Sequence, residues 1–91
     1  MKPSDLKAAL KAKRPVFGFM VSATSSMRWG RVFAGRTLDF VVIDSEHGSR
    51  DRTEIQHLCG MLRRADVTPV VRVPIPKSEW VAMALDAGTA G

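Results

Sequence analysis

A short polar cluster in the middle of the chain has the residue types needed for chemistry. Asp44, Glu46 and His47 fall within four positions, directly after the apolar run Phe40–Ile43. Two carboxylates and an imidazole at this spacing could bind a metal ion or transfer protons. The same residues could instead form a solvated loop whose carboxylates cap the next helix. The spacing alone does not separate these two interpretations.

The residues before the cluster predict a buried strand. The run Phe40–Ile43 is continuously apolar, and three of its four residues are β-branched. Such a run, bounded by polar residues, is typical of a strand that is covered on both faces in a parallel sheet. The cluster therefore lies after the carboxyl end of a strand, where α/β folds place their functional residues.

Strands and helices alternate along the rest of the chain. Apolar runs predict strands at 16–21 and 68–73. Gly18 indicates a bulge or a close backbone approach in the first of them, and Pro74 stops the second. Helical spacing predicts four helices: one capped by Ser4 and ended by Pro15, one at 27–34, one opening at Asp51, and one between Ser78 and Gly88. A helix followed by three strand–helix units predicts an α/β fold with a parallel sheet and right-handed crossovers.

The helix that follows the polar cluster has the clearest pattern. Asp51 and Glu54 have the spacing of a capping box, with aspartate as the cap. Apolar residues then recur on one helix face, at Ile55, Leu58, Cys59 and Leu62. We therefore expect Cys59 in the core rather than as a reactive thiol. His57 falls off this face and is expected in solvent, without a functional role.

Composition narrows the class of protein. The 91 residues include 14 basic and 9 acidic side chains, for a net charge of +5, and 45% are hydrophobic. No apolar run approaches the roughly 20 residues that cross a bilayer. The basic residues are scattered, and no nucleic-acid-binding motif or glycine-rich phosphate loop accompanies them. We expect a small anionic substrate and neither a nucleic-acid nor a membrane partner. A single cysteine and the absence of a signal-peptide pattern predict the cytoplasm.

Two neighbouring strands should deliver their polar residues to one edge of the sheet. Because the carboxyl ends of parallel strands share an edge, Arg72 is expected beside Asp44, Glu46 and His47. A guanidinium, a base and carboxylates at one rim suit an anionic carbonyl substrate. The alternative for Arg72 is a purely structural ion pair with Asp44 or Glu46, since an unpaired arginine is costly to bury.

Three motifs, in this order, resemble those of one enzyme family. They are Asp39–Gly48 with its Ile-Asp-Ser-Glu-His-Gly core, then Pro69–Pro74, then Leu85–Gly88. They closely resemble the 4-hydroxy-2-oxoheptanedioate aldolases, which are metal-dependent class II pyruvate aldolases built on a TIM barrel. The resemblance extends over about residues 7–91. It implies that the chain forms the N-terminal part of a (β/α)8 barrel.

The resemblance also implies roles for individual residues. His47 matches the family's proton acceptor, Arg72 the arginine that steadies the pyruvate enolate, and Asp86 an aspartate that raises the basicity of the histidine. Asp44 is an alternative partner for His47, and Glu46 could contact a metal ion through water. The implied reaction is reversible cleavage of a 4-hydroxy-2-oxo acid to pyruvate and an aldehyde, as in the catabolism of aromatic compounds. A divalent Mg, Mn or Co ion would polarise the 2-oxo group.

The chain departs from this family in length. A (β/α)8 barrel takes about 250 residues, and residues 1–91 supply three of the eight units, ending before the fourth strand. In the family the metal ligands, a glutamate and an aspartate, belong to later strands, as does a substrate-binding glutamine. We therefore expect no metal ligand and no bound metal in this chain. We also expect it to be inactive alone, whereas the full-length family would act on small 2-oxo acids as homo-oligomers.

A second hypothesis comes from another class of protein. The chain could be a small, self-standing α/β binding or oligomerisation module without catalysis, which would be monodisperse and unfold cooperatively. The fragment hypothesis predicts association instead, because an open three-stranded sheet has unpaired edges and an uncovered apolar face. Size-exclusion behaviour and a thermal melt would distinguish the two hypotheses.

Overall fold

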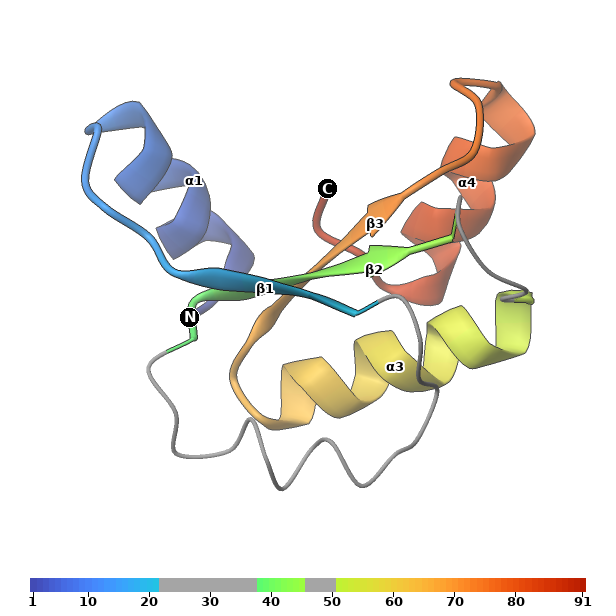
Figure 1. The fold of residues 1–91 in the computed structure, drawn as a ribbon, viewed down its shortest axis with the longest axis horizontal. Coiled ribbons are helices and arrows are strands. Elements are labelled where there is room, and N and C mark those ends of the chain that lie inside the picture. Colours follow the sequence, from blue (N-terminus) through green and yellow to red (C-terminus); the bar gives the residue numbers. More distant parts are fainter. Residues whose placement is uncertain (22–37, 46–50) are drawn as a thin grey trace.

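The computed structural model describes residues 1–21, 38–45 and 51–91 and shows a parallel three-stranded sheet with helices on both faces (Figure 1). The elements, in chain order, are α1 (Pro3–Lys11), β1 (Gly18–Val21), β2 (Phe40–Asp44), α3 (Arg52–Arg64), β3 (Thr68–Arg72) and α4 (Ser78–Ala87). The helix predicted at 27–34 lies outside the described residues. The predicted α/β order and the parallel pairing of the strands are confirmed.

The strands pair in the order β1-β2-β3, all parallel and without stagger. Met20 pairs with Val42, and Val42 with Val70. Because paired residues of parallel strands point to the same face, this register assigns alternate residues to two different surfaces. Asp44 pairs with Arg72 in the last position of the sheet.

One face of the sheet carries the main core. Val21, Val41, Ile43 and Val71 pack in one cluster with the buried residues of α3 and with Met83 and Ala84 of α4. The predicted stripe of α3 is confirmed, because all four of its residues are buried: Ile55, Leu58, Cys59 and Leu62. Burial of Val41, Ile43 and these four side chains supplies the main hydrophobic stabilisation of the structure.

The opposite face of the sheet is covered differently. Figure 1 shows α1 on the side of the sheet away from α3. Leu6 and Ala9 of α1 are buried but do not belong to the main core cluster. Leu10, the apolar residue that follows Ala9, is 58% exposed. The face shared by Asp44 and Arg72 is therefore the less densely packed one.

Two helix caps predicted from the sequence are correct. The side chain of Asp51 accepts a hydrogen bond from the Glu54 backbone N–H at 2.8 Å, which satisfies an otherwise unpaired donor in the first turn of α3. Gly88 ends α4 in the left-handed conformation with φ of 107°, which costs glycine little because it has no Cβ.

Two other caps were predicted wrongly. Helix α1 begins at Pro3 with Lys2 as its N-cap, so Ser4 lies inside the first turn. Proline is favoured there because its fixed φ suits the helix and its missing N–H is not needed. Helix α4 begins at Ser78 itself, after Lys77, with no side-chain cap. Helix α1 also ends at Lys11, before Pro15, and Lys13 takes a positive φ of 57°.

The strand ends also differ slightly from the prediction. Strand β1 begins at Gly18 rather than at residue 16, because Phe17 bonds with Asp39 instead, its N–H donating to Asp39 Oδ2 at 2.9 Å. Strand β3 ends at Arg72, one residue early. At Gly18 the close approach is that of the Phe40 ring and not of another backbone segment, since a Cβ placed there would lie 2.2 Å from Cζ of Phe40. None of the described helices is long and apolar enough to span a membrane.

Candidate active site

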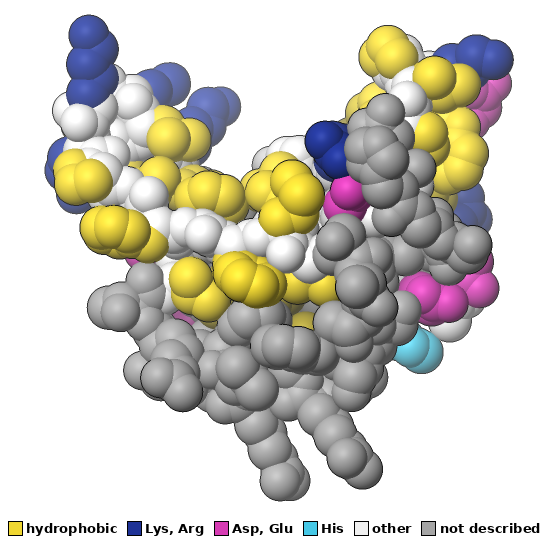
Figure 2. All heavy atoms as spheres, in the orientation of Figure 1, with side chains coloured by type: hydrophobic (Ala, Val, Ile, Leu, Met, Phe, Trp, Pro, Cys, Tyr) yellow, Lys and Arg dark blue, Asp and Glu magenta, His cyan; other side chains and the backbone are white. Residues whose placement is uncertain are grey.

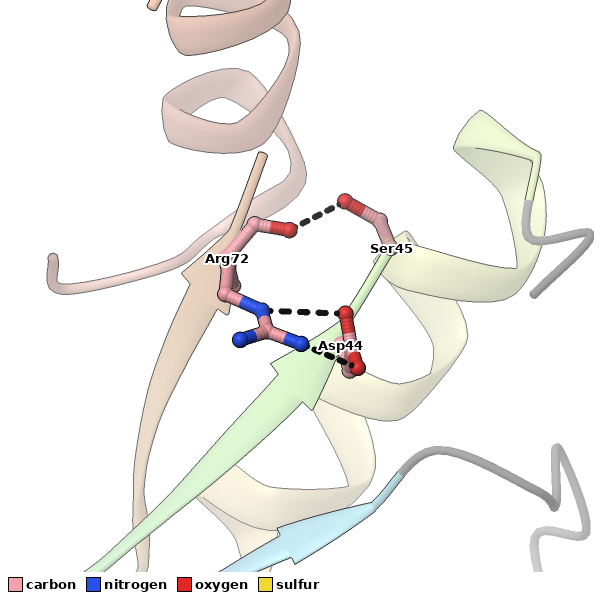
Figure 3. A network of polar contacts seen from close by, with 3 residues as sticks. All are labelled: Asp44, Ser45 and Arg72. Atoms are coloured by element: carbon pink, nitrogen blue, oxygen red, sulfur yellow. Dashed lines mark hydrogen bonds and ion pairs between the residues drawn. The ribbon is translucent and has the colours of Figure 1, made fainter. Parts of the chain in front are cut away.

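The carboxyl end of the sheet holds an ion pair between β2 and β3. Arg72 Nε donates to Asp44 Oδ1 at 3.2 Å, and Arg72 Nη2 donates to Asp44 Oδ2 at 2.7 Å (Figure 3). The sequence produces this contact directly, because Asp44 and Arg72 are register partners and point to the same face. The paired fork geometry fixes both the position and the plane of the guanidinium.

The two partners differ in their exposure to solvent. The side chain of Asp44 is 3% exposed, whereas that of Arg72 is 40% exposed. A buried carboxylate needs a cation and hydrogen bonds to offset its lost hydration, and Arg72 supplies both. The guanidinium, in contrast, keeps access to the solvent at the rim, where it could meet an anionic ligand.

Ser45 makes a second contact between the same two strands. Its hydroxyl donates to the carbonyl oxygen of Arg72 at 2.5 Å (Figure 3). Its backbone N–H donates to the same oxygen at 3.1 Å. Asp44 therefore holds the side chain of Arg72, and Ser45 holds its main chain. Sequence reasoning missed Ser45, whose only signal was its place directly after the strand.

His47 and Glu46, the other members of the predicted cluster, lie outside the described residues. In the chain they follow Ser45, the residue that closes the β2–β3 pairing. Their predicted roles as proton acceptor and supporting carboxylate stay predictions.

Asp86 lies apart from the ion pair in the described structure. It is an exposed residue in the last turn of α4. The Arg63 Nε at the end of α3 donates to the Gly88 carbonyl at 2.7 Å. The end of α4 is thus held beside the end of α3, the segment that leads into the start of β3. The structure does not bring Asp86 to the rim where β3 ends, and its predicted role stays a prediction.

The described residues do not assemble a metal site. No group of three or more His, Cys, Asp and Glu side chains within them could hold a metal ion. Asp44, the carboxylate at the described rim that could act as a ligand, is paired with Arg72. The donor set at the described rim therefore suits an anion better than a divalent cation.

Cys59 contributes to the core and not to the rim. It is fully buried and free of any disulfide, as the sequence predicted. Burial raises the pKa of its thiol from 9.0 to about 11, against a smaller opposing effect of the Arg63 charge. A thiol with this pKa is almost entirely protonated at neutral pH, so it is a poor nucleophile. His57, off the buried stripe, is exposed as expected.

The arrangement of the helices and strands is shared with known aldolases. An HpcH/HpaI aldolase from Desulfitobacterium hafniense DCB-2 superposes with a TM-score of 0.82 and 32% identity, over 92% of this chain and 32% of that one. A hydroxypyruvate/pyruvate aldolase from Agrobacterium fabrum is 32% identical over 82 residues, which are 90% of this chain and 30% of that protein. The chain matches the N-terminal part of an HpcH/HpaI-type class II aldolase.

The aldolase match extends to other proteins of the same fold. A hydroxypyruvate/pyruvate aldolase from Paraburkholderia phytofirmans is 32% identical over 87 residues, covering 93% of this chain and 33% of that one. The citrate synthase SbnG superposes with a TM-score of 0.80 and 31% identity, over 92% of this chain and 34% of that chain. No family model matches the sequence.

The match also identifies the fold. The helix and three parallel strands correspond to the N-terminal part of an aldolase TIM barrel, as the sequence predicted. The chain spans about a third of the length of the curated relatives it matches. Aldolases of this type are generally metal-dependent. The carboxyl ends of the strands, where Asp44 and Arg72 lie, form the catalytic edge of a TIM barrel.

Proposed function

We propose that this chain supplies the N-terminal part of a class II aldolase active site, in which Arg72 binds the anionic end of a 2-oxo acid. The observation that supports this most strongly is the Asp44–Arg72 pair at the carboxyl ends of β2 and β3, in a chain that matches class II aldolases. The proposed reaction is reversible aldol cleavage of a 4-hydroxy-2-oxo acid to pyruvate and an aldehyde.

The chemistry follows from what each residue can do. Arg72, oriented by Asp44, presents a fixed positive charge that would stabilise the negative charge developing as the carbon–carbon bond breaks. His47, which follows β2, would take the proton from the substrate hydroxyl as the aldehyde leaves, with Asp86 raising its basicity. A divalent ion such as Mg, Mn or Co would polarise the 2-oxo group when bound.

The metal ion would not be held by the described residues of this chain. Because Asp44 is engaged by Arg72, we expect the ligands to come from parts of the barrel beyond these three units. We therefore propose that residues 1–91 alone bind a 2-oxo acid anion weakly, bind no metal tightly and do not catalyse cleavage.

The binding part of the proposal can be tested with the purified 91-residue chain. Oxalate, a stable analogue of the pyruvate enolate, is titrated while the backbone amide signals of β2 and β3, which are present in every variant, are followed by NMR. We expect saturable binding in the millimolar range, lost in Arg72→Gln and kept in Arg64→Gln, which removes an exposed arginine from the end of α3. Equal binding by the wild-type chain and Arg72→Gln would contradict the assignment of Arg72.

Catalysis is tested separately. The chain is incubated with a 4-hydroxy-2-oxo acid and Mg, Mn or Co ions, and pyruvate is measured. We expect no more pyruvate than with the metal ion alone. Pyruvate release that depends on the chain and disappears in Arg72→Gln would show that three units suffice for catalysis and would overturn the inactivity proposal.

A further inference from the structure

Ser45 lies where the pairing of β2 and β3 ends. It directly follows Asp44, the last residue of β2, and it is 7% exposed. Its hydroxyl donates to the carbonyl oxygen of Arg72 at 2.5 Å (Figure 3), and its backbone N–H donates to the same acceptor at 3.1 Å. A carbonyl oxygen has two lone pairs, so one residue supplies a donor for each of them.

The main chain of Arg72 needs such support because β3 ends there. Arg72 is the last residue of the strand, and Pro74, two residues further, has no N–H to continue the pairing. Strand ends open more easily than strand centres. The Ser45 hydroxyl adds a side-chain bond to the last backbone bond, so the terminal contact between the strands is doubled.

Side-chain and main-chain contacts together determine where the guanidinium lies. The two bonds from Arg72 to Asp44 fix the guanidinium relative to β2 only while the main chain of Arg72 stays in register. We propose that Ser45 is a positioning residue, whose hydroxyl holds the Arg72 main chain so that Asp44 can orient the guanidinium toward a 2-oxo acid anion. This inference rests on the proposed function, because it assigns a specific purpose to the Arg72 site.

The chain contains a matched control for a merely structural hydroxyl. Thr89 is as buried as Ser45, and its Oγ1 lies within hydrogen-bond distance of two carbonyl oxygens, that of Pro69 in β3 at 3.1 Å and that of Gly91 at 2.8 Å. Removing this hydroxyl should affect the stability of the sheet, but it does not touch Arg72. Ser45→Ala removes a hydroxyl that bonds to Arg72, whereas Thr89→Val removes one that contacts Pro69 and Gly91. Ser45→Thr keeps the hydroxyl at the site.

The experiment measures the hydrogen-exchange rate of the Arg72 Nε–H by NMR in the folded chain, together with oxalate affinity and the thermal melt. In Ser45→Ala we expect exchange to accelerate by roughly three- to tenfold, the factor that corresponds to one lost hydrogen bond. Oxalate affinity should fall by a similar factor. Ser45→Thr should restore both values, and Thr89→Val should lower the melting temperature while leaving the exchange rate of Arg72 unchanged.

The outcomes separate this inference from the proposed function. Wild-type exchange and wild-type oxalate affinity in Ser45→Ala would overturn the positioning role. Equal acceleration of Arg72 exchange in Ser45→Ala and Thr89→Val would also overturn it, because the effect would then be general loosening of the sheet. If the wild-type chain binds no oxalate, the proposed function fails, while the exchange comparison still decides whether Ser45 positions Arg72.

Discussion

At the rim of the sheet, one arginine has two different tasks. Arg72 offsets the burial of the Asp44 carboxylate, and it also presents a half-exposed positive charge to the solvent. Removing a partner from a buried pair leaves an uncompensated charge, which is more costly than losing the pair as a whole. The anion affinities of Arg72 variants must therefore be compared under conditions where each variant is equally folded. A thermal melt of each variant is needed to show that lost binding is not caused by unfolding.

A second buried residue allows a prediction about pH. The pKa of Cys59 is raised by burial from 9.0 to about 11 in the folded chain, so the unfolded thiol ionises first as the pH rises. The unfolded state then binds fewer protons, and the free energy of unfolding must fall between pH 9.0 and about 11. We expect a loss of about 2 kcal/mol over this window, measured by urea unfolding. Below pH 9.0 this contribution should be constant.

The control for this prediction is Cys59→Ala. The variant should be less stable at every pH, because it leaves a small cavity, but its stability should lose less between pH 9.0 and about 11. Parallel stability curves for the two proteins across this window would show that Cys59 does not cause the decline.

At the scale of the elements, the sequence predicted features that depend on residues close together in the chain, such as a helix cap and a buried helix face. The capping box at Asp51 and the buried stripe of α3 were predicted from spacing alone, because both depend on residues within one helix. The N-caps of α1 and α4 were wrong, because α1 begins at Pro3 after Lys2 and α4 begins at Ser78 after Lys77, so each serine lies inside its helix.

The candidate site was predictable to the extent that sheet topology determines it. Parallel strands required Arg72 to meet Asp44, and the structure confirms that pair, which the sequence had offered as a structural alternative. The bond from Ser45 to the Arg72 carbonyl depends on register and strand length, which the sequence leaves open. The place of Asp86 depends on how α4 packs on α3, a tertiary feature that a motif does not encode.

Strand β1 allows a prediction about close packing. A Cβ at Gly18 would lie 2.2 to 2.5 Å from three ring atoms of Phe40, so Gly18→Ala forces the ring out of its place over the sheet. We expect a loss of about 1 to 2 kcal/mol in the free energy of unfolding, measured by urea or thermal unfolding. Phe40→Leu should recover part of this loss when it is combined with Gly18→Ala.

The matched control for this substitution is Gly60→Ala in the middle of α3. An added Cβ there would meet only the Arg64 side chain, at 3.9 Å. Alanine also favours helix over glycine, so this variant should gain up to about 1 kcal/mol. Similar effects of the two substitutions would mean that the contact with Phe40 is not what requires a glycine at position 18.

At the scale of the whole molecule, the two faces of the sheet are unequally covered. Figure 2 shows hydrophobic side chains gathered across the hollow between α1 and α4. A groove of about 510 Å³ lies between α1 and β3, lined mainly by apolar residues such as Leu6, Leu10 and Val70. Met20, on the same face as Val70, is 46% exposed. In a complete barrel this is the face that other strands and their side chains would fill.

The edge of β3 shows where a further strand would pair. The backbone N–H of Ala90 donates to the Pro69 carbonyl at 2.8 Å, and that of Val71 donates to the Gly91 carbonyl at 3.0 Å. The segment after α4 thus runs along β3 as an added strand does in a parallel sheet. This agrees with the TIM-barrel fold of the matched aldolases, in which β3 is not an edge strand.

Because the sheet face that bears Met20 and Val70 is incompletely covered, we predict that the purified chain associates with itself through this face. Because Lys7 and Lys11 flank Leu10 and the net charge is +5, like charges oppose the contact, and added salt should strengthen it by screening them. Sedimentation at rising concentration should show dimers or larger species. These should become monomeric in Leu10→Glu and Met20→Glu but not in Leu85→Glu, which changes an exposed apolar residue of α4 instead.

A wild-type chain that stays monomeric at high salt and melts cooperatively would contradict this prediction. It would favour the self-standing module, because a module that needs no further strands should already have its apolar surface covered.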